Sequence, residues 1–231
     1  MDLEVIYEDN HMIVVNKRAG EIVQGDKTGD EPLLERVRQY LKEKYAKPGN
    51  VFCGLVHRLD RPVAGLVIFA KTSKALSRMN ELFRNGSVKK TYWAITRNAP
   101  AETEAHLTHW ITTVEKTNKS TAHNSPKVNA KEARLSYRLI AQSDRYHLLE
   151  VQLETGRKHQ IRVQLSAIGC PVKGDLKYGD KRSNPDGSIS LMARKVEFIH
   201  PVSGKEICLY APVPKNDTLW AAFNNLTNKP E

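Results

Sequence analysis

The chain has 231 residues and a formal net charge of +10, with 40% hydrophobic and 27% charged residues. This balance fits a globular protein of one domain or two closely packed lobes, and it excludes a low-complexity chain. No apolar run is long enough to span a membrane, and the acidic start lacks a secretory signal, so we expect a cytoplasmic protein.

The first part of the chain is predicted to alternate between short strands and helices. Apolar residues at helical spacing predict a helix over 33–45, which Pro48 ends. Thr72 or Ser73 caps a second helix, and Gly86 supplies the left-handed residue after its last turn. Strands are predicted around these helices, in chain order, at residues 5–7, 12–15, 51–56, 65–70 and 88–96.

The second part of the chain begins with a polar segment, residues 100–129, which predicts an irregular excursion or a loosely ordered hairpin. A helix is predicted over 159–168, ending at Gly169. Strands are predicted, in chain order, at residues 133–140, 146–153, 191–199 and 207–210. Strands outnumber helices and hairpins connect many of them, so the predicted fold class is α+β with a mostly antiparallel sheet.

Basic residues are concentrated in two segments of the chain. Residues 71–97 hold seven basic residues and one acidic residue, and residues 115–138 hold six and two. A basic protein of this size is attracted to polyanions, of which nucleic acid is the commonest. The clusters therefore favour RNA or DNA as a partner, bound through its phosphates, over a merely solvated surface.

The segment His57-Arg58-Leu59-Asp60-Arg61-Pro62 has the clearest chemical pattern. It lies between two strand-like runs and places a carboxylate between two arginines. Nearby positive charge favours the ionised form of Asp60, which could then act as a nucleophile or base. The arginines could bind phosphate or a flipped base. Taken alone, an ion-paired turn explains the segment better.

Residues 57–72, HRLDRPVAGLVIFAKT, resemble the signature of the RluA-type pseudouridine synthases, HRLDRxTSGLxxxAKT. The resemblance matches Asp60 to the family's nucleophile. Residues 89–92, KKTY, resemble the strand with the active-site tyrosine, which maps onto Tyr92. Residues 155–162, TGRKHQIR, resemble a motif whose final arginine, here Arg162, pairs with the catalytic aspartate. Shorter matches extend the resemblance over nearly the whole chain, at Asn16-Lys17, Gly174-Asp175, Tyr178-Gly179, Leu191-Met192-Ala193 and His200-Pro201.

The sequence departs from the family pattern at several positions. Arg18 stands where the family usually has proline, and Val63 and Ala64 replace the usual Thr-Ser. The other departures are Lys158 for Thr, Gln164 for His and Met192 for His. None of them is the aspartate, the tyrosine or the paired arginine, so we expect an active enzyme.

The resemblance also implies an architecture. It predicts a single catalytic domain over residues 1–231, without the small N-terminal RNA-binding module that many relatives have. It implies a bent, mostly antiparallel mixed sheet with flanking helices, and it places Asp60 in a basic cleft between the two halves of the sheet. A cleft lined with one sign of charge raises the local concentration of an RNA substrate.

The residue types suit the isomerisation of uridine, which exchanges an N-glycosidic for a C-glycosidic bond without redox change or cofactor. Asp60 would attack the ribose or the uracil ring, or promote elimination at the sugar, and the sequence leaves these routes open. Arg162 would keep Asp60 ionised, and Tyr92 would stack on the base. A base in folded RNA must be flipped out, and Arg58 would hold it or fill its place. The other residues expected to bind substrate are His57, Arg61, Lys90, Arg157 and Leu191.

Two other classes of protein are alternatives. A non-catalytic RNA-binding protein with this fold would not need Asp60, Tyr92 and Arg162 together. A metal-dependent nuclease would need clustered carboxylates, and His106 and His109 lack further ligands at zinc spacing, so no metal is expected. Ribosomal RNA is the substrate expected first and transfer RNA the alternative, while the uridine that is modified cannot be read from the sequence. We expect a monomer.

Overall fold

The structure, a computed structural model, describes residues 3–215 and 217–227. The chain divides into two compact units. The first unit consists of Met1–Val88 and Ala193–Pro212, and the second of Lys89–Met192 and Val213–Glu231. Each unit contains its own strands, helices and buried residues.

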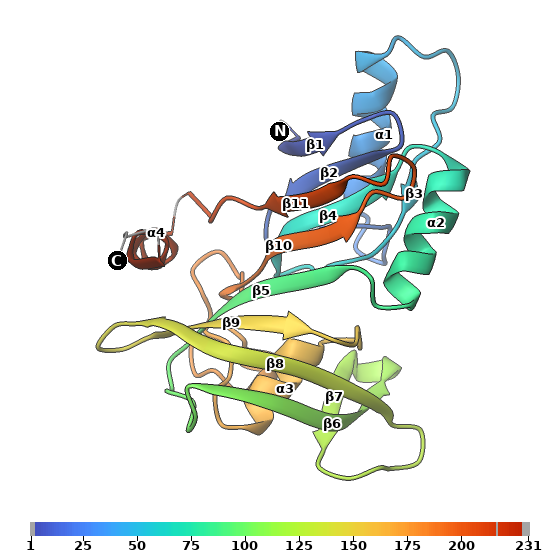
Figure 1. The fold of residues 1–231 in the computed structure, drawn as a ribbon. Helices are drawn as coiled ribbons and strands as arrows, with labels where there is room; N and C mark the ends of the chain where they lie inside the picture. The colour runs from blue at the N-terminus through green and yellow to red at the C-terminus, as the bar shows by residue number, and fades with distance from the viewer. Residues whose placement is uncertain (1–2, 216, 228–231) are drawn as a thin grey trace. The chain divides into compact units, whose positions relative to one another are not determined.

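The strands of the first unit are β1 (Val5–Glu8), β2 (Met12–Lys17), β3 (Gly54–Leu55), β4 (Ala64–Ala70), β10 (Leu191–Ile199) and β11 (Glu206–Tyr210). Their order is β1-β2-β4-β10, with β3 also paired to β4 and β11 to β10 (Figure 1). The pairs β1–β2, β2–β4, β3–β4 and β10–β11 are antiparallel. The first two residues of β10 belong to the second unit, and the rest of the strand belongs to the first.

Strand β4 lies at the centre of the first unit, because its apolar sequence AGLVIFA is buried at all seven positions. Helix α1 (Leu33–Lys44) buries Leu33, Val37 and Leu41 on one face. Helix α2 (Ser73–Arg84) packs on β3 and β4. Thr72 caps α2, since its Oγ1 accepts a hydrogen bond from the N–H of Ala75 at 3.1 Å.

The strands of the second unit are β5 (Lys89–Thr96), β6 (Glu104–Val114), β7 (Lys119–His123), β8 (Lys131–Gln142) and β9 (His147–Leu153). They follow the order β5-β9-β8-β6-β7, and each neighbouring pair is antiparallel. Two short 3-10 helices, η1 (Glu115–Thr117) and η2 (Leu176–Tyr178), lie in the connections. In this order β7 is the edge strand, paired only with β6 among the strands described.

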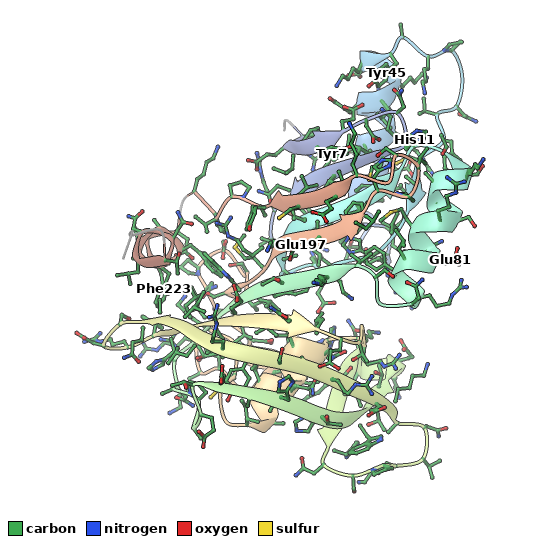
Figure 2. All side chains as sticks on the ribbon, viewed as in Figure 1. Tyr7, His11, Tyr45, Glu81, Glu197 and Phe223 are labelled. Atoms are coloured by element: carbon green, nitrogen blue, oxygen red, sulfur yellow. The ribbon has the colours of Figure 1, made fainter. Side chains whose placement is uncertain are left out.

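Two helices cover the strands of the second unit. Helix α3 (Gln160–Ala167) contacts β6 and β7, and its Val163 joins a buried cluster with Ile111, Ala133 and Tyr178. Helix α4 (Thr218–Thr227) contacts β8 and buries Trp220 and Phe223, of which Phe223 is labelled in Figure 2. The apolar sides of both helices thus complete the core of this unit.

The α+β class and the antiparallel strand pairs are confirmed. The strand predicted at 191–199 has those bounds in the structure, and residues 100–129 form the hairpin β6–β7 rather than an irregular excursion. Two features differ from prediction. The segment 51–56 contributes only the two residues of β3, since β10 lies along the same edge of β4, and the sequence did not predict α4. The single catalytic domain, the bend of the sheet and the basic cleft stay predictions.

Candidate active site

Asp60 lies in a tight turn between β3 and β4. The N–H of Val63 donates to the carbonyl of Asp60 at 3.0 Å and closes the turn. Leu59 is buried and anchors the turn to the core, whereas Asp60 is half-buried and Arg58 is exposed. The backbone of the turn is therefore held in place around a half-buried Asp60.

A buried lysine holds this turn from the end of β2. Lys17 has no exposed surface, and its Nζ donates to the carbonyls of Arg18, Arg61 and Val63 at 2.9, 3.1 and 2.7 Å. An ammonium group has three N–H donors, so these carbonyls use all of them. Burial lowers the pKa of Lys17 to about 8, and the negative charges of Glu21 and then of Asp60 oppose this shift. Because two of the three carbonyls belong to the Asp60 turn, Lys17 fixes the backbone that presents the carboxylate.

The close approach of β4 and β10 requires glycine at position 65. Gly65 pairs with Lys17 across β2 and β4, and its φ is +115°. A Cβ atom at this position would lie 2.3 Å from the carbonyl oxygen of Ala193, well inside van der Waals contact. Any side chain would therefore push β10 away from the strand that follows the Asp60 turn.

Two of the residues expected to bind substrate, His57 and Arg61, have partners of their own in the first unit. The N–H of Ile68 donates to His57 Nε2 at 3.2 Å, and the His57 ring stacks on Phe83 with ring centroids 5.0 Å apart. Arg61 forms an ion pair with Asp30 at the surface. These contacts orient both side chains, and their roles toward RNA stay predictions.

Arg162 is held by a buried two-point ion pair in the second unit. Its Nε donates to Oδ2 of Asp175 at 2.6 Å, and its Nη2 donates to Oδ1 at 2.9 Å. The side chains of Arg162 and Asp175 are 6% and 1% exposed. A two-point pair fixes the plane of the guanidinium as well as its position. The carboxylate of Asp175 therefore orients Arg162 and balances its charge where water screens little.

The loop that precedes β10 places Asp175. Gly174 has a φ of +88°, and a Cβ atom there would lie 2.8 Å from both the Asn184 side chain and the carbonyl oxygen of Ser188. The N–H of Gly174 donates to Oδ2 of Asp180 at 2.5 Å. Glycine is therefore required next to Asp175, because the loop folds tightly over this position.

The remaining predicted site residues lie on other elements of the second unit. Tyr92 and Lys90 belong to β5, where Tyr92 is 8% exposed and burial lowers the pKa of Lys90. Leu191 is the buried first residue of β10. Arg157 is exposed, and its Nε donates to a backbone carbonyl of β8 at 2.8 Å. These residues belong with Arg162 to the second unit, whereas the Asp60 turn belongs to the first.

Two residues contribute to the site without a role predicted from the sequence, Lys17 and Asp175. Lysine is rarely buried without partners. A lysine at the end of the buried strand MIVVNK therefore indicated that Lys17 has hydrogen-bond partners within the protein. For Asp175 the local signals were the glycine before it and the match of Gly174-Asp175 to the family pattern, and neither identified its partner. Its partner is 13 positions away in the chain, and this separation lies outside any helical or strand spacing.

Over residues 3–215 and 217–227, no helix is long and apolar enough to cross a membrane. In the same part of the chain, no three His, Cys, Asp or Glu side chains are grouped so that they could bind a metal ion. His106 and His109 are an odd number of positions apart on β6, so they point to opposite faces of the strand. The side chain of His106 is 83% exposed, whereas His109 is buried.

Comparison with known proteins gives consistent matches. The family model described as RNA pseudouridylate synthase matches residues 11–167. The chain is 31% identical over 237 residues to ribosomal large subunit pseudouridine synthase D of Zymomonas mobilis, covering 98% of this chain and 74% of that protein. It is 30% identical over 238 residues to tRNA pseudouridine synthase C of Vibrio parahaemolyticus, covering 95% and 93%. The chain spans 66%, 58% and 65% of three other curated relatives.

The fold also matches a solved structure. Human RNA Pseudouridylate Synthase Domain Containing 4 superposes with a TM-score of 0.79 at 24% sequence identity. The match covers 99% of this chain and 95% of the human one. At this level of identity the likeness concerns the fold.

Proposed function

Because the chain belongs to the RNA pseudouridylate synthase family, we propose that it converts specific uridines in structured RNA to pseudouridine, with Asp60 as the nucleophile. The observation that carries this proposal is the Asp60 turn. Its backbone is clamped by the buried Lys17, while Asp60 itself is half-buried. A reacting group gains most when it is held in position before the substrate arrives.

The proposed reaction breaks the bond between N1 and C1′ of uridine and forms a bond between C5 and C1′. C5 loses its hydrogen as a proton and N1 gains one, so no oxidant, external group or cofactor is needed. Asp60 attacks the ribose or the uracil ring, or removes a proton to begin elimination at the sugar. Each route requires the ionised carboxylate.

Arg162 and Tyr92 complete the proposed catalytic set. A guanidinium near a carboxylate favours its ionised form. The Asp175 carboxylate supports this role, because a fixed guanidinium can stabilise charge in the reaction without having to reorganise. Tyr92 stacks on the uracil and takes part in moving its proton.

Folded RNA is the proposed substrate, bound through its phosphates. A uridine within a helix or loop has to be flipped out before its C5 and C1′ can be reached. We assign this step to Arg58, which is exposed beside Asp60 and can fill the place of the extruded base. His57, Arg61, Lys90, Arg157 and Leu191 are assigned to substrate binding. The relatives are named for large-subunit ribosomal RNA and for transfer RNA, and we propose ribosomal RNA first.

The test is release of tritium from RNA that contains 5-tritiated uridine. Large-subunit ribosomal transcripts and pooled transfer RNA transcripts are incubated separately with the wild type and with Asp60→Asn. The wild type is expected to release tritium, and Asp60→Asn to lose more than about a thousandfold in rate because the isosteric amide is no nucleophile. Asp144→Asn removes an exposed carboxylate from the turn between β8 and β9 and serves as the matched control.

The same experiment separates the alternatives. Binding of RNA without tritium release would point to a non-catalytic RNA-binding protein. Strand cleavage that depends on added magnesium would point to a nuclease. Full activity of Asp60→Asn would remove Asp60 from the nucleophile role, whichever RNA responds.

A further inference from the structure

Tyr178 contacts the guanidinium of Arg162 over its ring. The Arg162 Cζ atom lies 5.0 Å from the centroid of the Tyr178 ring. A guanidinium over the face of an aromatic ring is attracted to it, and more strongly where water is absent. Tyr178 and Arg162 are each 5% exposed. Arg162 is therefore held along its edge by Asp175 and over its face by Tyr178.

The hydroxyl of Tyr178 fixes the ring at its far end. The backbone N–H of Ser120 donates to this hydroxyl at 2.9 Å. The same hydroxyl lies 2.7 Å from Nδ1 of His159. Since Ser120 uses a lone pair of the oxygen, the hydroxyl proton is available for His159 Nδ1. Ser120 belongs to β7, and His159 is the residue before α3, so the ring is tied to two elements at once.

Two further features support a rigid arrangement. His159 adopts a left-handed conformation with a φ of 57°, which is unfavourable for a residue with a side chain and persists only where its contacts hold it. The Tyr178 ring also packs in the apolar cluster with Ile111, Ala133 and Val163. Burial also raises the pKa of the Tyr178 hydroxyl.

We propose that Tyr178 is a positioning residue for Arg162, with its ring holding the guanidinium and its hydroxyl anchoring the ring to β7 and to His159. The inference rests on the proposed function, in which Arg162 acts on the reaction. In this proposal β7 contributes to catalysis without contacting the substrate. Its Ser120 holds the hydroxyl of Tyr178, and the ring of Tyr178 holds Arg162.

The test compares Tyr178→Leu with Tyr178→Phe in the tritium-release assay. Leucine removes both ring and hydroxyl, so kcat is expected to fall about tenfold while KM for RNA stays within about twofold. Phenylalanine keeps the ring over Arg162, so kcat is expected to stay within about threefold of the wild type. Both variants lose the hydroxyl and are expected to melt at lower temperature. Rates are compared at a temperature where circular dichroism shows each variant to be fully folded.

Controls separate positioning from general stability. Ser166→Ala removes the hydroxyl that donates to the backbone carbonyl of Tyr178 at 2.6 Å, and it leaves ring and phenol untouched. We expect it to lower the melting temperature and leave kcat unchanged. If Tyr178→Leu retains the wild-type kcat, the positioning role is wrong. If Tyr178→Phe is as slow as Tyr178→Leu, the role assigned to the ring is wrong and the hydroxyl alone positions Arg162.

Asp60→Asn and Arg162→Lys, measured in the same series, distinguish the two levels of inference. If both lose activity while Tyr178→Leu keeps it, the proposed function stands and only the role of Tyr178 fails. If Asp60→Asn keeps the wild-type rate, the nucleophile role in the proposed function fails. If Arg162→Lys keeps it, the role of Arg162 on which this inference rests fails.

Discussion

The two units hold their key residues in different ways. In the first unit, Lys17 reaches the Asp60 turn through backbone carbonyls, and no side chain of the turn is needed for this clamp. In the second unit, Arg162 is held by the carboxylate of Asp175 and the ring of Tyr178. The first arrangement therefore depends on the path of the chain, and the second depends on the identity of two side chains.

This difference bears on two departures from the family pattern, at Arg18 and Val63. By the resemblance described above, they stand where proline and threonine are expected. The hydrogen bonds from Lys17 go to the carbonyl oxygen of each, and every residue, proline included, has one. The clamp is therefore insensitive to these substitutions, whereas a change at Asp175 would remove the contact itself.

The contrast predicts its largest effect at Asp175. Asp175→Asn takes away the carboxylate charge that pairs with the buried Arg162, which is expected to cost about 4 kcal/mol in the free energy of unfolding. The rate of tritium release is expected to fall more than about a hundredfold, because the guanidinium loses its fixed plane. Urea unfolding and single-turnover rates measure both effects. Asp186→Asn removes a carboxylate from the same loop and, as the control, should leave the rate unchanged. If Asp175→Asn keeps the wild-type rate, the Asp175 carboxylate is not needed to hold Arg162 for the reaction.

Lys17→Met tests the backbone clamp. The substitution keeps the apolar stem but leaves the carbonyls of Arg18, Arg61 and Val63 without this donor, so we expect a loss of about 3 kcal/mol in stability. The turn keeps the hydrogen bond from Val63 to Asp60, so the rate of the folded fraction should fall less than about tenfold. Chemical denaturation and rates at saturating RNA provide the measurements. If Lys17→Met loses as much rate as Asp175→Asn, catalysis depends on the backbone clamp as strongly as on the Asp175 ion pair, and the contrast between the units is wrong.

The first unit also contains a side-chain network away from Asp60, centred on Glu8. Although burial opposes it, hydrogen bonds from Lys44, Lys71, Tyr45 and Tyr40 lower the pKa of Glu8 to about 2 from its usual 4.5. The stabilisation from Glu8 is therefore present above pH 4.5 and is lost as the pH falls toward 2. We expect about 2 kcal/mol of this acid-dependent loss to disappear in Glu8→Gln, measured by urea unfolding across that range. Unchanged activity of Glu8→Gln at pH 7 would confirm that the network is separate from the turn.

The smallest effect on stability is expected at Arg61. Its ion pair with Asp30 is exposed, at 44% and 52% of the two side chains, so Arg61→Ala should change the free energy of unfolding by less than about 0.5 kcal/mol. Because Arg61 is proposed to contact a phosphate, KM for RNA should rise severalfold in Arg61→Ala. The slope of the logarithm of the binding constant against the logarithm of the salt concentration should fall by about one. Arg38→Ala, which removes another exposed ion-paired arginine from this unit, is the control. If both variants weaken RNA binding equally, Arg61 contributes only its positive charge and has no specific contact with phosphate.

Periodicity in the sequence predicted most elements to within a few residues, because strand 65–70 is apolar over its whole length and strand 191–199 alternates charged and apolar residues from Lys195 to Phe198. It did not predict α4, whose ten residues bury only Trp220 and Phe223 and depend on packing against β8. Motif resemblance identified Asp60 and Arg162 as candidates. It could not reveal how they are held, since the contact between Lys17 and Val63 joins residues 46 positions apart, and only the folded chain brings them together.

The division of the first unit into two chain segments has a consequence for biosynthesis. Strands β1, β2 and β4 leave the ribosome early, but β10 and β11, which complete their sheet, follow only after residues 89–192. At roughly 5–20 residues per second, the apolar β4 waits on the order of 5–20 seconds for its neighbour. During that interval its edge beside Gly65 is open to pairing with other nascent chains. The second unit, contiguous up to Met192, can fold first, so translation speed and chaperone access over this window should govern the yield of active protein.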